Sequence, residues 1–319
     1  MPDDTVVVYG QLARDLVLVV EDVPAAGHSA SVAERREMLG GKGANQAVAL
    51  AQLGMRPALV AAAGDDRAGT DLLRQAERDG VDVSATGRRA GTSTGLIVDI
   101  VDGRGQWRYL EELQPSVLLT EADVDASKRL LGRAQWASVQ LQQPPGAALA
   151  AARTARRAGC RVVLDGAPAG GEFRDELLAC ADVVRADARE AEMLAGFPVT
   201  DEGSARRAAA EILLHGPELV ALATGEAGDY FGWRGGGVLM PLAPVPVSDT
   251  TGAGDALTAA LITGLASGYT PPRVARLAAA AAAATVGHPG GRPDLTGAAL
   301  ARQVKVQEQG LRHGGSRLA

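Results

Sequence analysis

Aromatic residues are scarce in this chain of 319 residues. Phe, Trp and Tyr together make up 3% of the sequence, whereas hydrophobic residues reach 46%. The interior must therefore be built mostly from Ala, Val and Leu, and a site that stacks ligand rings between aromatic side chains has little material. The length suits two domains or one large α/β domain with an appendage.

Positive charge and cysteine are also in short supply. The net charge of −6 argues against a general nucleic-acid binder, because such a protein needs a basic face. Cys160 and Cys180 form no C-x-x-C pair, so a disulfide or metal role is disfavoured and a cytoplasmic location is expected. No membrane partner is expected, since no apolar run approaches the roughly 20 residues of a membrane span. The N-terminus "MPDDTVVVYG" has no basic segment, so a signal peptide is not expected there.

Several common catalytic signatures are missing from the sequence. Lys42 in "GGKGAN" is followed by Gly, so there is no P-loop, and no G-x-G-x-x-G opens a helix after the first strand. Neither H-E-x-x-H nor G-x-S-x-G occurs, which removes support for a zinc protease or an α/β-hydrolase. Any activity must depend on another arrangement of residues.

What is present is an alternation of apolar strands and Ala-rich helices. Strands are predicted for 5–10, 57–64, 136–141, 160–168, 182–186, 218–225 and 236–247, and helices for 40–54, 66–80, 146–158, 188–195 and 204–214. This alternation predicts an α/β fold with a doubly wound, mainly parallel sheet flanked by helices. Ligands of such sheets bind beyond the carboxyl ends of the strands.

Two segments interrupt this alternation. Residues 16–39 indicate two strands around Gly27, and residues 94–113 indicate two strands joined by a turn at 102–105. Together they predict a small antiparallel sheet that is separate from the main one. Both segments belong to a single predicted unit that spans residues 1–319.

The stretch "SDTTGAGDAL" (248–257) places Gly252, Ala253 and Gly254 directly before Asp255, at the start of an Ala-rich helix. A helix N-terminus exposes unpaired N–H groups and a partial positive charge, and three small residues leave those groups open to an anion. A carboxylate in the first turn can accept a proton from a hydroxyl group that attacks a bound phosphate. The pattern therefore indicates phosphoryl transfer.

The same residues also fit a tight turn with ordinary helix capping. A second glycine loop, "GGKGANQ" at residues 40–46, carries Lys and Asn and also leads into a helix. Taken alone it fits a solvated loop and N-cap. Two such loops in one chain favour the binding interpretation over the purely structural one.

These two loops resemble known signatures. "GGKGANQAVALAQLG" resembles the N-terminal signature of the ribokinase-like, or PfkB, carbohydrate kinases, and "DTTGAGDAL" resembles their C-terminal signature. The resemblance extends from "VVVYGQLARD" to "HPGGRPDL", and "GANQ" is closest to the ribokinases. It implies a ribokinase-like fold with a small β-sheet lid at segments 16–39 and 94–113. It also implies transfer of the γ-phosphoryl group of ATP, with Mg²⁺, to a hydroxymethyl group of ribose or a related sugar, and a homodimer.

The resemblance also implies roles for individual residues. Asp255 matches the catalytic base, and its three small neighbours match the anion hole: Gly252, Ala253 and Gly254. The residues that match sugar-binding positions are Asp15, Gly41, Lys42, Asn45 and Gln142. Those that match nucleotide-binding positions are Asp187, Thr224, Gly225 and Gly254. Metal positions are matched by Glu190, which acts indirectly on Mg²⁺, and by Asp249 and Thr251, which would hold a monovalent cation, usually K⁺.

The sequence departs from the ribokinase pattern at several positions. Asp187 stands where the family motif N-x-x-E has Asn, which adds negative charge near the phosphates. On the sugar side, Ala13 replaces Asn, Gln142 replaces Glu, and residues 114–116 lack the family's "GAN". A buried polar site rejects ligands that leave its groups unpaired, so these changes leave the identity of the sugar open.

Three functions are compatible with these residues: an ATP-dependent sugar kinase, a nucleoside kinase of the same family, and a catalytically silent sugar-binding or regulatory protein. The nucleoside kinase is disfavoured because bases are usually recognised by stacking and only Trp107 and Tyr109 stand near the lid. The silent protein is disfavoured by the intact Gly-Ala-Gly and Asp255, whereas the altered sugar side favours it. The sugar kinase is the leading interpretation.

Overall fold

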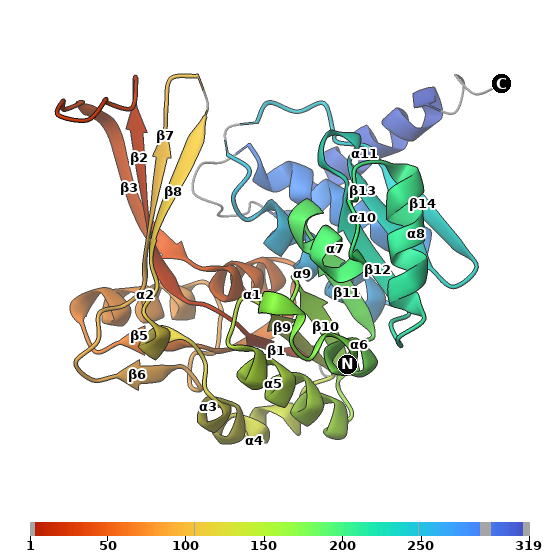
Figure 1. The fold of residues 1–319 in the computed structure, drawn as a ribbon, viewed down its shortest axis with the longest axis horizontal. Coiled ribbons are helices and arrows are strands. Elements are labelled where there is room, and N and C mark those ends of the chain that lie inside the picture. Colours follow the sequence, from red (N-terminus) through yellow and green to blue (C-terminus); the bar gives the residue numbers. More distant parts are fainter. Residues whose placement is uncertain (1–3, 105, 248, 288–294, 315–319) are drawn as a thin grey trace.

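The computed structural model describes residues 4–104, 106–247, 249–287 and 295–314, with side chains up to residue 306. The segment "HPGGRPDL", where the family resemblance ends, lies outside these residues except for Leu295. In the described chain, helices cover both faces of a central sheet, and a smaller sheet projects from one side of it (Figure 1).

The central sheet has eight strands in the described residues, in the order β14-β13-β12-β11-β10-β9-β1-β4. Neighbouring strands from β4 to β12 are parallel, and β13 and β14 add an antiparallel hairpin at one edge. The strands are β1 (Thr5–Tyr9), β4 (Arg56–Val60), β9 (Trp136–Gln140), β10 (Arg161–Asp165), β11 (Val183–Ala186), β12 (Leu219–Ala223), β13 (Asp229–Trp233) and β14 (Gly236–Met240). The predicted doubly wound, mainly parallel sheet is confirmed.

Two details of the predicted strands were wrong. The run 57–64 is divided: the chain leaves the central sheet at Ala61, and β5 (Ala62–Gly64) pairs with β6 (Gly87–Arg89) in a separate two-stranded sheet. The run is apolar throughout, so no residue in it marks the division. The strand β13 was missed, although Gly235, with φ 84°, forms a turn between it and β14.

Alternate residues of β1 point into two hydrophobic cores on opposite faces of the sheet. Val6 and Val8 belong to one core, and Val7 and Tyr9 belong to the other. Helices on the first face are α1 (Lys42–Gln52), α2 (Arg67–Arg78), α9 (Ala253–Ala266), α10 (Pro271–Thr285) and α11 (Gly297–Gly314). Helices on the second face are α3 (Glu121–Ala126), α4 (Lys128–Leu131), α5 (Pro145–Arg157), α6 (Arg174–Cys180), α7 (Ala188–Ala195) and α8 (Glu202–Leu213). None of the helices in the described residues is long and apolar enough to cross a membrane.

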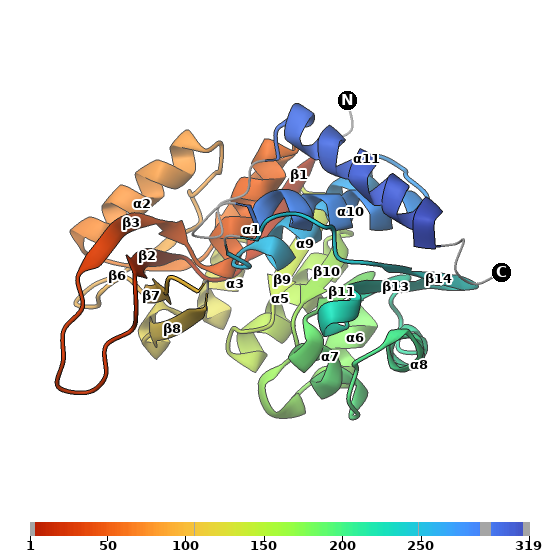
Figure 2. The same cartoon turned by 90° about the horizontal axis from the view of Figure 1, so that it is seen from above.

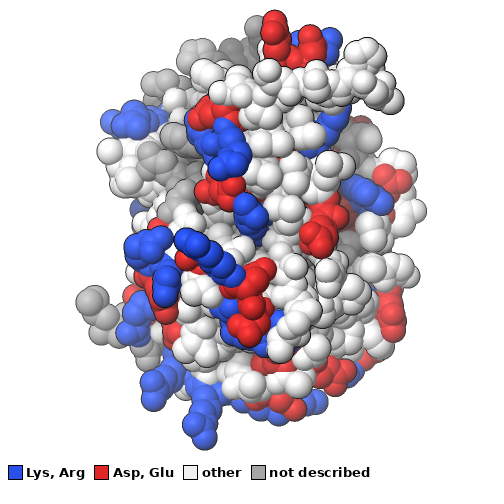
Figure 3. Space-filling model, turned by 90° about the vertical axis from the view of Figure 1, so that its left-hand side faces the viewer, with Lys and Arg blue, Asp and Glu red and all other residues white. Residues whose placement is uncertain are grey.

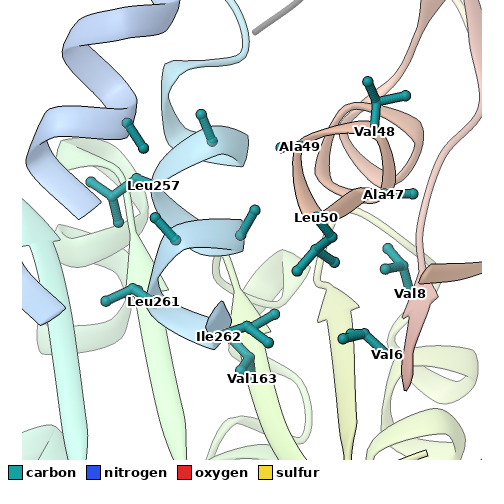
Figure 4. Close-up of a cluster of buried hydrophobic side chains, with 14 of the residues drawn as sticks. Val6, Val8, Ala47, Val48, Ala49, Leu50, Val163, Leu257, Leu261 and Ile262 are labelled. Atoms are coloured by element: carbon teal, nitrogen blue, oxygen red, sulfur yellow. The ribbon is translucent and has the colours of Figure 1, made fainter. Parts of the chain in front are cut away.

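Helices α1 and α9 pack against each other on the same face of the central sheet (Figures 1 and 4). Leu50 of α1 and Ile262 of α9 point toward the shared core near Val163 of β10 (Figure 4). Many of their other buried residues are Ala, and small side chains allow two helices to approach closely. The two glycine loops identified in the sequence precede these helices, so the packing of α1 against α9 brings the loops together.

The smaller sheet contains β2 (Ala13–Val20), β3 (Val32–Gly40), β7 (Leu96–Val101) and β8 (Trp107–Glu112), in the order β3-β2-β7-β8. Its outer pairs are antiparallel, as expected, but the central pair of β2 and β7 is parallel. Figures 1 and 2 show the sheet standing beside the helical body. On this side of the molecule, basic and acidic side chains are interspersed (Figure 3).

Candidate active site

A cleft of about 420 Å³ lies between the smaller sheet and the N-terminal ends of α1 and α9. We call it the main cleft. Its lining is Gln11, Asp15, Gly41, Lys42, Asn45, Ile97, Asp99, Tyr109, Glu111, Gln142, Arg185, Asp187, Thr250, Thr251, Gly252, Gly254 and Asp255. The fold thus brings most of the residues selected from the sequence into one place.

Asp255 is buried in the first turn of α9, where both of its carboxylate oxygens receive amide N–H groups from α1. Asn45 donates through Nδ2 to Oδ2 at 3.3 Å, and Gln46 donates through Nε2 to Oδ1 at 3.2 Å. Burial raises the pKa of Asp255 to about 7, helped by the charge of Asp165 and opposed by the charge of Lys42. A carboxylate held in this way can accept a proton near neutral pH.

The turn before Asp255 places two glycines in the lining of the main cleft. Gly252 is the N-cap residue of α9 with φ 73°, a left-handed conformation that favours glycine. Gly252 and Gly254 line the main cleft, whereas Ala253 does not, and its N–H donates to the carbonyl oxygen of Thr250 at 3.3 Å. The first N–H groups of a helix have no partner within the helix, so this end of α9 attracts anions.

Arg185, at the end of β11, was not identified from the sequence. Its Nη1 donates to Oδ1 of Asp165 at 3.1 Å, and Asp165 is the residue opposite it on β10. A Cβ atom on Gly254 would lie 2.3 Å from Nη2 of Arg185, so a larger residue there would require the guanidinium to shift. Burial would lower the pKa of Arg185, but the carboxylates of Asp165 and Glu190 outweigh burial and raise it. A fully charged guanidinium therefore lies directly beside the N-terminus of α9.

Lys42 and Asp187 lie at the same end of the main cleft. Nζ of Lys42 is 3.3 Å from Oε1 of Glu190. Asp187 and Glu190 form a capping box at the start of α7, in which each side chain accepts a backbone N–H of the other residue at 2.8 Å. Asp187 lines the main cleft, whereas Glu190 lies behind it. Burial would raise the pKa of Glu190, but Lys42 and Arg185 outweigh burial and lower it.

A second, mainly apolar cleft of about 250 Å³ adjoins the first, and we call it the side cleft. It shares Arg185, Thr250 and Gly254 with the main cleft. Its apolar lining is Pro241, Leu242, Ala243, Val245, Val247, Ala253, Leu257, Ala279, Ala282, Ala283 and Val286. Thr224 and Gly225 line neither cleft, and the hydroxyl of Thr224 donates to the carbonyl oxygen of Gly228 at 2.8 Å.

Asp249 and Thr251, the predicted ligands of a monovalent cation, lie close together in the segment that leads into α9. The N–H of Thr251 donates to Oδ1 of Asp249 at 2.8 Å, and Asp249 is buried. Its carboxylate and nearby backbone carbonyls are the oxygen donors that a hard cation prefers. No group of three or more His, Cys, Asp or Glu in the described residues could hold a metal ion, so Mg²⁺ would need the oxygens of a phosphate ligand.

The other end of the main cleft, formed by the smaller sheet, is acidic. Asp15 was selected from the sequence as a sugar-binding residue. The structure adds Asp99, Tyr109 and Glu111, which were not selected as site residues. Burial raises the pKa of Asp15 to about 8 and that of Asp99 to about 7, with further contributions from neighbouring carboxylates. The alternation of residues along β7 and β8 was the signal that could have identified the additional residues.

Comparisons with known proteins identify the family to which this chain belongs. The model of the pfkB family carbohydrate kinases matches residues 3–296. Ribokinase of Mus musculus is 30% identical over 265 residues, 80% of this chain and 80% of that protein. The ATP-dependent ribose-1-phosphate kinase of Halopiger xanaduensis is 31% identical over 293 residues, 92% of this chain and 95% of that protein.

Among solved structures, Arabidopsis thaliana ribokinase complexed with ribose and ATP superposes with a TM-score of 0.78 at 26% identity. The match covers 96% of this chain and 99% of that chain. The predicted ribokinase-like fold and the predicted enzyme class are both confirmed. The chain belongs to the pfkB family of carbohydrate kinases.

Proposed function

We propose that this protein transfers the γ-phosphoryl group of ATP to a hydroxymethyl group of a sugar. The observation that carries the proposal is the position of Asp255, buried between the amides of α1 and next to the exposed N–H groups at the start of α9. A base and an anion-binding helix end then face the same cleft. These are the two elements that phosphoryl transfer to an alcohol requires.

In the proposed reaction, Asp255 accepts the proton of the sugar hydroxyl group. The oxygen of that group forms a bond to the γ-phosphorus, and the bond from the γ-phosphorus to the oxygen that bridges to the β-phosphate breaks, releasing ADP. The N–H groups of Gly252 and Gly254, together with the charges of Arg185 and Lys42, stabilise the negative charge of the transferred group. A largely dissociative transition state demands little from the base, so a carboxylate with a pKa near 7 suffices.

ATP is proposed to lie across both clefts, with its phosphates between Arg185 and Gly254 and its base in the apolar side cleft. The side cleft adjoins the main cleft at these two residues and at Thr250, which is consistent with a ligand that has a charged end and an apolar end. Asp187 and Glu190 are proposed to act on Mg²⁺ through its water ligands, and Mg²⁺ would neutralise charge on the phosphates. The roles of Thr224 and Gly225 in nucleotide binding stay predictions.

The sugar is proposed to bind between Asp15, Gly41, Asn45 and Gln142, all of which line the main cleft. The names of the mouse and Arabidopsis relatives support ribose or a related sugar. A coupled assay that detects ADP, run over pentoses, hexoses, keto-acid sugars and nucleosides, tests the proposal. Turnover of a sugar supports it, turnover of nucleosides alone would indicate a nucleoside kinase, and sugar binding without turnover would indicate a silent protein.

A monovalent cation is proposed to bind at Asp249 and Thr251, with K⁺ as the first candidate. A cation at these residues would strengthen the positive potential at the N-terminus of α9. Replacing K⁺ by tetramethylammonium should lower kcat, because the larger ion does not fit among buried oxygens. An equal kcat in both salts would exclude the site.

Assembly and location are also proposals. We propose a homodimer that pairs through the smaller sheet, because every residue of its edge strand β8 is exposed and Leu110 is 60% exposed. Light scattering of the purified protein would show a monomer if this is wrong. A cytoplasmic location is consistent with the proposed use of ATP and with the unpaired Cys160 and Cys180, and cell fractionation tests it.

A further inference from the structure

The face of the smaller sheet that lines the main cleft carries three carboxylates. Along the paired strands, Asp15 is opposite Ile97, Ile97 is opposite Glu111, and Asp99 is opposite Tyr109. Residues two apart on a strand point to the same face, so Asp15, Asp99 and Glu111 all face the cleft with Tyr109. In the described residues, no Lys or Arg of this sheet contributes to the cleft lining.

Two of these carboxylates are buried, and each has one oxygen without a hydrogen-bond partner in the described structure. Asp15 is 5% exposed and Asp99 is 3% exposed, and Oδ1 of each has no hydrogen-bond partner in the described structure. The other oxygen of Asp99 accepts only a long hydrogen bond of 3.4 Å from the hydroxyl of Thr251. The carboxylate of Asp15 lies against Gly40, where a Cβ atom would come within 1.9 Å of it. The fold therefore leaves room for a carboxylate at this position but supplies no donor for its Oδ1.

The cations nearest to this end of the cleft are already paired. Lys42 is paired with Glu190 and Arg185 with Asp165, both at the end of the cleft near the N-terminus of α9, where the phosphates are proposed to bind. In the sheet itself, Arg14 is paired with Glu37 and Arg108 with Asp102, outside the lining of the main cleft. A sugar that enters the cleft displaces the remaining water, which raises the cost of uncompensated negative charge.

On this basis, and given the kinase function proposed above, we propose that the sugar substrate carries a protonated amine that binds to Asp99 and Asp15. An ammonium group has three N–H donors and a positive charge, so it supplies both the donors and the charge that the two carboxylates lack. A neutral sugar hydroxyl supplies a donor without a charge. A sugar phosphate, such as the substrate in the name of the Halopiger relative, would bring further negative charge to an end that already holds three acids.

The test compares sugars that differ only in one amine. The ADP assay is run with the pairs glucosamine and glucose, mannosamine and mannose, and 2-amino-2-deoxyribose and ribose, with ribose 1-phosphate as an anionic probe. Saturating K⁺ is present throughout, so that a cation at Asp249 contributes equally to both members of a pair. The variant Asp99→Asn keeps the size of the side chain and removes its charge, and Glu112→Gln, on the outer face of β8, is the matched control.

In at least one pair we expect kcat/KM to be at least about tenfold higher for the amine, the effect of one charge-assisted hydrogen bond. Asp99→Asn should reduce this preference to within about threefold, whereas Glu112→Gln should leave it unchanged. Turnover of neutral sugars without an amine preference would overturn the inference and leave the kinase function intact, because Asp99 would then be protonated and bind a neutral hydroxyl. A preference that survives Asp99→Asn would also overturn it. If no sugar is turned over and no amine shifts the melting temperature more than its partner, both proposals fail.

Discussion

The two ends of the main cleft differ in charge and in the way the chain builds them. The end proposed to bind phosphate, or phosphate end, is formed by the N-termini of α1 and α9 and by β11, and it holds the cations Lys42 and Arg185. The end proposed to bind the sugar, or sugar end, is formed by the smaller sheet and holds Asp15, Asp99 and Glu111. The first end depends on helices that share a hydrophobic core, whereas the second depends on side chains of a projecting sheet. Substrate preference can therefore change on the sheet without disturbing the part that performs the chemistry.

The largest expected effect is the loss of turnover without loss of sugar binding when Asp255 is replaced. Asp255→Asn should lower kcat by about 10²- to 10⁴-fold, the usual contribution of general acid–base catalysis, because an amide cannot accept the proton. Sugar affinity, measured by titration calorimetry, should stay within a few-fold, since the sugar end is intact. A variant that retains near-normal turnover would remove Asp255 from the role of base.

The next largest effect is the fall in kcat when the charge of Arg185, which was not identified from the sequence, is removed. Replacing Arg185 alone would leave Asp165 buried without its partner, so the informative variant is the double substitution Asp165→Asn with Arg185→Met. We expect kcat to fall by about 10²- to 10³-fold, as for the loss of one group that stabilises the transition state. Arg185→Lys, which keeps the charge, is the control. If kcat of the double variant is unchanged while its melting temperature is normal, Arg185 does not act on the phosphates.

At the sugar end, replacing an aspartate by asparagine should change KM for the sugar more than kcat. Asp15→Asn should raise KM for the sugar by about tenfold, the cost of losing a hydrogen bond between the buried carboxyl group and the sugar. The value of kcat at saturation should change only a few-fold, because the base and the N–H groups of α9 remain. An equal loss in kcat would show that the two ends do not act separately.

The smallest expected effect is the dependence of the rate on pH. Only the ionised form of Asp255 accepts a proton, and its pKa is raised from 3.8 to about 7. At saturating sugar, where the titration of Asp15 and Asp99 matters least, kcat should therefore fall about tenfold per pH unit below about pH 7 and level off above it. The residual activity of Asp255→Asn should lack this break. A flat profile down to about pH 5 would mean that the carboxylate is ionised throughout, as an ordinary aspartate is.

Much of the phosphate end could be predicted because its signals are local. Three small residues before Asp255 and the glycine loop before α1 each lie within a few residues, and both helices followed from runs of Ala and Leu. The pair of Asp165 and Arg185 could not be predicted in this way, because it depends on the register of β10 against β11.

The sugar end was predicted less completely for a similar reason. Asp15 was identified from its place in a motif, but Asp99 is a single acid in the apolar strand "LIVDIV", whose alternation gives the face of the side chain and not its burial. Its burial depends on how β7 pairs with β2 and on the position of Thr251, 152 residues away. Long-range packing of this kind leaves no trace in a single stretch of sequence.

Tyr109 connects the two ends. Its hydroxyl shares a hydrogen bond of 2.6 Å with the hydroxyl of Thr251, so β8 is tied to the turn that leads into α9. Any outward swing of the sheet that admits a sugar must break this bond and release the turn. Binding of a sugar at one end of the cleft then changes the conformation of the turn at the other end. We expect sugar and ATP to alter each other's affinity by the same factor.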